Sequence, residues 1–318
     1  MSDFCNITQW HEAGFTGKGI NVWVTEGYTS HSRSCRKRVL DAAPDANVIL
    51  GRMTYGTKNG KVDFFNVIEN NDGNEQPPVP LEEFLKKHNI NVLSTSLSPS
   101  PYNKSSSIIG KYWIDIQKKY NLPIFCASGN DSSKNKSFAT NVAWMVGALV
   151  ERSGKLVRAS YSNGGEGLDF AESVGWWSGT SSATPYLAGK CAVLLSRYNN
   201  MSFNDVYDYM KMNCQDFGDI GEDPLYGFGM FVFPDVNEKW TGKYDEVIIG
   251  SDESDVQVNP LNPLITTTKI IVNGVTKTVR RVMVENENYI RLRDFDEVLG
   301  VCKVDYDSKQ NLPVVKNK

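Results

Sequence analysis

The feature that most constrains the fold is an alternation, over the first 200 residues, between short apolar runs and helix-like stretches. The apolar runs are rich in Val, Ile and Leu, as strands buried on both faces are. Strands separated by helices are usually parallel, because each crossover returns the chain to the same edge. We therefore expect an α/β fold with a mostly parallel sheet covered on both faces. The expected strands are 20–25, 47–50, 90–94, 122–127 and 142–150, and the expected helices include 81–88, 111–119 and 185–198.

Composition places the chain among globular proteins and excludes several classes of partner. Of its 318 residues, 40% are apolar and 22% are charged, which suits a sizeable core. A formal net charge of −3 gives no general attraction to nucleic acid or to anionic membranes. The six cysteines lie far apart without a CxxC pair, and the first residues lack the apolar core of a signal peptide. We therefore expect reduced thiols in a cytoplasmic protein, with lysis or a phage particle as routes of release.

Local composition divides the chain into three parts: a main domain over 1–240, a linker over 241–265 and a small β-rich module over 266–318. Within the main domain, the polar, turn-rich stretch 55–80 predicts an exposed loop. The linker is acidic and contains Asn and Pro. In the last part, the pair Asn273-Gly274 indicates a hairpin, followed by a short helix.

Residues 179–189 read Gly-Thr-Ser-Ser-Ala-Thr-Pro-Tyr-Leu-Ala-Gly and place Ser181 where a helix is expected to begin. A serine at such a point can present its hydroxyl to a neighbouring base, and its backbone N–H can face an oxyanion. Small residues at 183, 188 and 189 would let the helix sit deep against a sheet. The alternative is an ordinary buried helix after a glycine turn.

These eleven residues resemble the nucleophile motif of the subtilisin-like serine protease family, with every fixed position filled. The resemblance implies a subtilisin-like three-layer fold, endopeptidase activity through an acyl-enzyme, and a protein or peptide substrate. It extends over about three quarters of the chain. The further blocks are 17–26 (the strand that ends in the acid), 31–46 (the histidine block), 92–97 (the strand that pairs with substrate), 126–130, 159–163 and 226–229.

The resemblance assigns the acid, base and nucleophile in the family's chain order. His31 takes the place of the base, Ser181 that of the nucleophile, and Glu26 that of the acid, which is aspartate in the family. Of the carboxylates before His31 (Asp3, Glu12 and Glu26), only Glu26 closes a predicted strand, at the edge where parallel sheets hold their sites. Only four residues separate Glu26 from His31, so an ordinary strand-end carboxylate and a solvated loop histidine are the alternatives.

The oxyanion donor and the substrate contacts follow from the same resemblance. The side chain of Asn130 would donate to the oxyanion together with the N–H of Ser181, and a Gly-Asn pair directly after an apolar strand suits that role. A simple turn residue is the alternative for Asn130. Substrate contacts are expected at Ser96, Leu97, Ser98, Ala127, Ser128 and Gly129.

The basic residues Arg33, Arg36, Lys37 and Arg38 predict a solvated helix face, with a preference for acidic substrates as the alternative. No acidic cluster has the spacing of a calcium loop, so we expect no metal and no cofactor.

Parts of 266–318 resemble a small repeat module named after the amino-terminal stalk domain of copper amine oxidases, which occurs on bacterial and phage proteins. The resemblance implies neither copper nor oxidase activity and indicates no partner. A β-rich extension of the main domain is the alternative.

A catalytically inactive subtilase that serves as a binding or signalling scaffold is the rival function. Two departures from the family pattern favour the rival: Glu26 stands in place of the aspartate, and Ser32 replaces the usual glycine of the histidine block. The intact Ser181 and Asn130 favour the enzyme. Covalent labelling by a fluorophosphonate separates the two.

Overall fold

The computed structural model describes residues 4–58, 61–70, 73–96, 108–138, 143–219, 221–238 and 240, together with five strands beyond residue 265. Two compact units divide the chain, Met1–Glu238 and Lys239–Lys318. None of the helices among these residues is long and apolar enough to cross a membrane.

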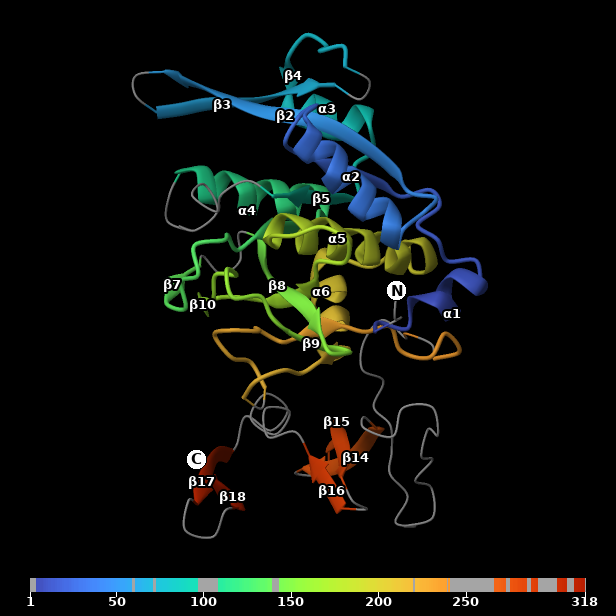
Figure 1. The fold of residues 1–318 in the computed structure, drawn as a ribbon, viewed down its shortest axis with the longest axis vertical. Helices are drawn as coiled ribbons and strands as arrows, with labels where there is room; N and C mark the ends of the chain where they lie inside the picture. The colour runs from blue at the N-terminus through green and yellow to red at the C-terminus, as the bar shows by residue number, and fades with distance from the viewer. Residues whose placement is uncertain are drawn as a thin grey trace. The chain divides into compact units, whose positions relative to one another are not determined.

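The first unit is built on a nine-stranded sheet (Figure 1). Its middle is parallel, in the order β11-β8-β6-β5-β1-β2, so the predicted α/β architecture is confirmed. Antiparallel strands β3 and β4 extend the sheet beyond β2, and β9 pairs with β8. The strands are β1 (Asn21–Val24), β2 (Asn47–Lys58), β3 (Lys61–Glu69), β4 (Val79–Pro80), β5 (Val92–Thr95), β6 (Ile124–Ala127), β8 (Trp144–Arg152), β9 (Lys155–Arg158) and β11 (Phe170–Ser173).

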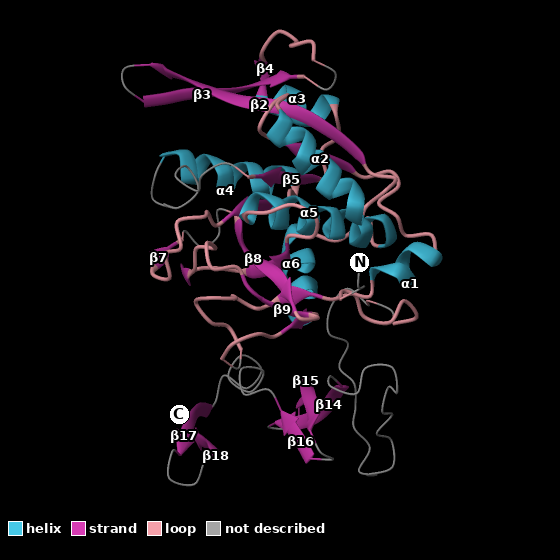
Figure 2. Ribbon diagram, in the orientation of Figure 1, coloured by secondary structure: helices cyan, strands magenta, loops and turns pink. Residues whose placement is uncertain are grey.

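Helices cover both faces of this sheet (Figure 2). Trp23 of β1 lies in a core cluster with Phe84 of α3 and Trp113 of α4. Its neighbours Val22 and Val24 point to the other face, because successive side chains of a strand alternate. On that face α5 packs along β1, β5, β6, β8 and β11, and α2 packs on α5. The helices are α1 (Ile7–Glu12), α2 (Ser30–Ala42), α3 (Leu81–Lys87), α4 (Ile108–Tyr120), α5 (Thr180–Arg197) and α6 (Phe203–Met212).

The contact between α2 and α5 depends on a small residue. A Cβ atom on Gly189 would lie 2.5 Å from the carbonyl oxygen of Val39 and 2.8 Å from the Cβ of Ala42. Only glycine therefore allows the two backbones to approach this closely. Behind this contact, Lys190 donates to Glu172 at 2.6 Å, and both side chains are fully buried.

Two sequence predictions are wrong in this unit. The stretch 55–80 is not an exposed loop, because β3 and β4 occupy much of it; the alternation of buried Phe65 and Val67 with half-exposed Asn66 and Ile68 is typical of a strand. Arg38 is not solvated either. It is 1% exposed and donates to the carbonyl oxygens of Ser182 (3.3 Å) and Ser173 (2.8 Å).

Short strand pairs complete the first unit: β7 (Lys136–Ser137) with β10 (Gly165–Glu166), and β12 (Cys214–Gln215) with β13 (Met230–Phe231). The second unit holds an antiparallel sheet and a separate hairpin. The register of β14 and β15 ends at the pair Val272–Val275, around the predicted Asn273-Gly274 turn. That turn, the predicted linker 241–265 and the predicted short helix lie outside the described residues. The strands are β14 (Thr266–Val272), β15 (Val275–Val284), β16 (Glu287–Ile290), β17 (Cys302–Asp307) and β18 (Leu312–Asn317).

Candidate active site

The carboxyl ends of three adjacent parallel strands deliver the predicted site residues to one edge of the sheet. Glu26 follows β1, Ser96 follows β5, and Asn130 follows β6. The registers Val24–Ser94 and Thr95–Cys126 keep these ends level. Open parallel sheets bind their ligands at this edge.

Glu26 is buried, with 9% of its surface exposed. Its Oε1 accepts a hydrogen bond from the backbone N–H of Ser96, whereas its Oε2 is buried and has no hydrogen-bond partner among the residues that the structure describes. Burial raises the pKa of this carboxyl group to about 7, and the Ser96 hydrogen bond opposes part of that rise.

His31 lies in the first turn of α2. A capping box fixes this turn, since the Thr29 hydroxyl accepts from the N–H of Ser32 (3.0 Å) and the Ser32 hydroxyl accepts from the N–H of Thr29 (2.7 Å). Ser32 thus anchors the helix that carries the histidine. The ring of His31 is half-buried and meets the edge of Trp177, with ring centroids 5.1 Å apart. Burial lowers the pKa of His31 and favours the neutral ring.

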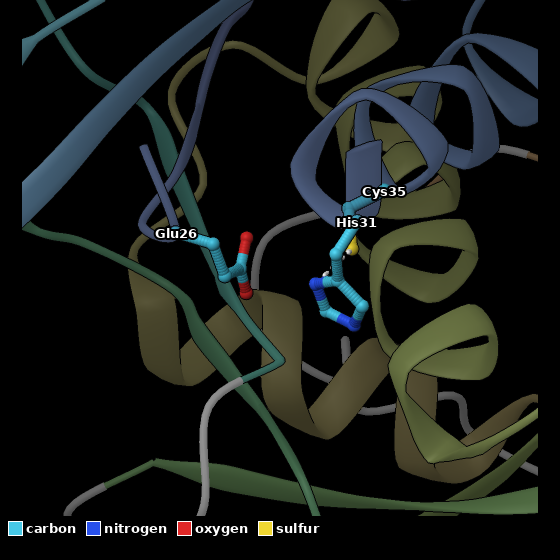
Figure 3. A group of neighbouring side chains, drawn as sticks. All are labelled: Glu26, His31 and Cys35. Carbon is cyan, nitrogen blue, oxygen red and sulfur yellow. Dashed lines mark hydrogen bonds between the residues drawn. The ribbon is translucent and has the colours of Figure 1, made fainter. Parts of the chain in front are cut away.

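Glu26, His31 and Cys35 form one cluster (Figure 3). One ligand atom of each, a carboxylate oxygen, a ring nitrogen and the thiol sulfur, lies within 4.8 Å of the others. Cys35 is one helical turn after His31, and its Sγ lies 3.8 Å from the His31 Nδ1. The short connection between Glu26 and His31 therefore brings the two side chains together. Among the described residues, this is the one cluster of three side chains able to ligate a metal.

Ser181 is the second residue of α5, after Gly179 with a φ of 86°. Its carbonyl oxygen accepts hydrogen bonds from the Ser96 hydroxyl (3.3 Å) and the Cys35 thiol (3.6 Å). The segment that carries the predicted nucleophile thus touches the neighbours of both the predicted acid and the predicted base.

Asn130 is exposed and lies beside the start of α5. Its Oδ1 accepts hydrogen bonds from the backbone N–H (2.9 Å) and the hydroxyl (3.1 Å) of Thr180. A backbone N–H can only donate, so the oxygen must face Thr180. The amide nitrogen Nδ2 is then the group that remains for a ligand.

The predicted substrate contacts fall into three groups. Leu97 and Ser98 lie outside the described residues. Ser96 and Gly129 lie at the site, because their backbone N–H groups donate to the Glu26 carboxyl group and to the Thr180 hydroxyl, respectively. Ala127 is buried in β6. The Ser128 side chain points away from the site, because its hydroxyl donates to the carbonyl of Asn163 at 3.1 Å and is fully buried. This arrangement does not support a substrate contact by the Ser128 side chain.

The other two histidines lie elsewhere. The Nε2 of His11 is 2.8 Å from the carbonyl oxygen of Ala42, and His88 pairs with Glu69 at 2.9 Å. Their partners are structural, which leaves His31 as the histidine of the site.

Sequence reasoning missed three residues of the site: Cys35, Trp177 and Thr180. The spacing of Cys35 from His31 carries a signal, since residues four apart share one face of a helix. No sequence pattern indicates that Trp177 packs on His31, or that Thr180 orients Asn130.

Comparison with known proteins identifies the family of the chain. Residues 25–229 match the sequence profile described as "Subtilase family". The structure of a prenylagaramide maturation protease, PagA, is 14% identical, with a TM-score of 0.52, and the match covers 71% of this chain and 95% of that one. Sphericase is 16% identical, with a TM-score of 0.49 and coverage of 69% and 93%. No curated protein sequence matches the chain. The chain belongs to the subtilase family. It is a subtilisin-like serine peptidase.

Proposed function

We propose that this protein is a serine endopeptidase that cleaves peptide bonds through an acyl-enzyme, with Ser181 as nucleophile, His31 as base and Glu26 as orienting acid. Asn130 Nδ2 and the backbone N–H of Ser181 form the oxyanion hole. The N–H of Ser181 belongs to the first turn of α5, where N–H groups have no acceptor within the helix.

The observation that carries this proposal is the buried Oε2 of Glu26, which has no hydrogen-bond partner among the described residues, on a carboxyl group that has one oxygen within 4.8 Å of a ring nitrogen of His31. A buried carboxylate oxygen without a hydrogen bond costs free energy, which a donor from His31 would recover. With its Nδ1–H directed to Glu26, the ring of His31 presents a basic Nε2 to the nucleophile.

The reaction then follows from the positions of these groups. Ser181 Oγ attacks the peptide carbonyl carbon as His31 takes its proton, and the charged ring is stabilised by the Glu26 carboxylate. The oxyanion receives hydrogen bonds from Asn130 and from the N–H of Ser181. His31 returns the proton to the departing amine, and water hydrolyses the ester in the second half of the cycle.

The test is labelling of the purified full-length protein with a fluorescent fluorophosphonate. We expect covalent labelling of the wild-type protein at Ser181, with loss of both labelling and peptidase activity in Ser181→Ala. Ser182→Ala is the matched control, because the hydroxyl of Ser182 is buried and donates to the carbonyl of Val174. A folded wild-type protein that never labels would favour the inactive scaffold.

A further inference from the structure

The chemistry of the Glu26–His31–Cys35 cluster extends beyond peptide hydrolysis. Its three ligand atoms, oxygen, nitrogen and sulfur, are the three kinds that bind zinc in proteins. They come from one continuous stretch of chain, in which β1 fixes Glu26 and the first turns of α2 fix the other two residues. The arrangement is drawn in Figure 3.

The spacing of these atoms is close to that of a tetrahedral site. Bond lengths of about 2.0–2.3 Å imply ligand atoms roughly 3.3–3.8 Å apart. The Cys35 Sγ and the His31 Nδ1 are already 3.8 Å apart. All three atoms lie within 4.8 Å of one another, so a side-chain shift of about 1 Å would bring the remaining pairs to coordination distance.

A second observation points to a cation at this place. Glu26 is nine-tenths buried, and no described residue forms a hydrogen bond with its Oε2. A bound cation would satisfy that oxygen. Cys35 is fully buried, whereas His31 is half-buried, so the exposed side of His31 is the route of entry.

We propose that Glu26, His31 and Cys35 bind a zinc-type divalent cation that reversibly inhibits the peptidase. The cation replaces the proton of the Cys35 thiol, which is released to solvent, and takes the lone pair of the His31 Nδ1. Glu26 supplies the third ligand, and a water molecule completes the tetrahedron. Both the hydrogen bond between Glu26 and His31 and the tautomer that catalysis needs are then lost. The inhibition rests on the proposed function, whereas the binding does not.

Binding is measured first, with Co²⁺ as a spectroscopic substitute for zinc. Titration of the full-length protein should give one cobalt per chain and a thiolate-to-cobalt charge-transfer band. Ser181→Ala keeps all three ligands and should give the same band. Cys35→Ser should lose it, and Cys35→Ala serves the same purpose if the serine variant does not fold. His88→Asn removes a histidine outside the cluster and should leave the band unchanged.

Inhibition is measured next, as peptidase activity against zinc concentration. Loss of the sulfur ligand should raise the half-inhibitory concentration by at least about tenfold in Cys35→Ser. Cobalt bound without the charge-transfer band, or equal inhibition of Cys35→Ser and wild type, would overturn the proposal. A cysteine-dependent band in a protein that neither labels nor cleaves would keep the cation site and reject the peptidase.

Discussion

At the scale of single residues, Glu26 uses its two carboxylate oxygens differently. Oε1 is held by the N–H of Ser96, whereas Oε2 has no hydrogen-bond partner within the described residues and faces His31 only in the proposed triad. The family's aspartate is one methylene shorter. One carboxylate oxygen of Glu26 lies within 4.8 Å of a ring nitrogen of His31, so in the proposed triad the extra methylene brings the carboxylate closer to the ring than an aspartate on the same backbone would.

Glu26→Gln should therefore lower kcat strongly, because a neutral amide does not stabilise the imidazolium. Values for removal of this acid in related triads are on the order of 10⁴. Glu26→Asp should lose about 10²-fold, since the carboxylate falls short by about one bond. Steady-state kinetics on a peptide substrate measure both. Glu69→Gln, at the acid that pairs with His88, is the matched control. Full activity of both Glu26→Gln and Glu26→Ala would remove Glu26 from the mechanism.

At the scale of elements, the start of α5 holds Asn130, the proposed oxyanion donor, which lies in the loop after β6. The hydroxyl of Thr180 donates to the Oδ1 of Asn130 and accepts from the N–H of Gly129 at 3.1 Å. The helix thus holds the loop after β6 at two points. The chain directly after Asn130 is held by Asn163, whose Oδ1 accepts from the N–H groups of Asp131 (3.0 Å) and Ser133 (3.1 Å).

Thr180→Val keeps the shape and the backbone N–H but removes the hydroxyl. We expect kcat to fall by about tenfold with little change in KM, which corresponds to one hydrogen bond. Thr180→Ser should restore most of the activity. Asn130→Leu removes the donor itself and should cost roughly 10²–10³ in kcat. A fall in stability without a change in kcat for Thr180→Val would assign this residue a structural role only.

The elements also show where sequence reasoning succeeds. Strand β6, for example, is a continuous apolar run that is buried on both faces, so local composition predicts it. The stretch that contains β3 was wrongly predicted as a loop because the residues on either side of it are polar and rich in turn formers. The alternation of buried residues, at Phe65 and Val67, is too short to outweigh that composition. Arg38 was predicted on the surface because its burial depends on carbonyl groups from α5 and β11, which no local pattern reveals.

At the scale of the whole molecule, the buried acid Asp169 is expected to make stability depend on pH, in addition to Glu26. Asp169 is contacted by the N–H of Met145 (2.7 Å) and the hydroxyl of Tyr207 (2.7 Å), and it joins β8 to α6. Burial raises its pKa to about 7; Glu222 adds to the rise, and the hydrogen bonds and Lys211 oppose it. The folded chain keeps this proton up to about pH 7, whereas the unfolded chain releases it near pH 4. The contribution of Asp169 to the free energy of unfolding should therefore fall as pH rises between these values.

Asp169→Asn should remove this dependence, since a neutral amide does not titrate. Between pH 4 and pH 7, the free energy of unfolding of the wild type should fall by at most about 4 kcal/mol more than that of the variant. Urea unfolding at several pH values measures it. Asp45→Asn, at an exposed carboxylate, is the control. Parallel stability curves for wild type and Asp169→Asn would contradict the assignment.

The division of the chain gives a further prediction. Contacts of the first unit run to its last residues, where Trp10 donates to the carbonyl of Pro234 at 2.9 Å and Arg197 to that of Glu238 at 3.1 Å. A chain ending at about residue 245 should therefore fold and cleave short peptides. A chain ending at 229 loses the buried residues Phe231 and Phe233 and should not fold. Circular dichroism and peptide cleavage measure both, and an unfolded 1–245 chain would refute the prediction.

Sequence reasoning reached the main candidates of the site because their motifs are local: a helix start at Ser181, a strand end at Glu26 and a Gly-Asn pair at Asn130. The contacts that join these motifs are not local. The hydrogen bond from Ser96 to Glu26 spans 70 residues and that from Thr180 to Asn130 spans 50. Such contacts arise only when the sheet has formed.

The same separation has a consequence for a chain still being made. Cys35 touches the Ser181 segment across 146 residues of sequence. Synthesis at about 5–20 residues per second therefore completes the acid and base on the order of ten seconds before the serine exists. With the proposed triad, a nascent chain cannot cleave its neighbours on the ribosome until α5 has been translated and has packed on α2.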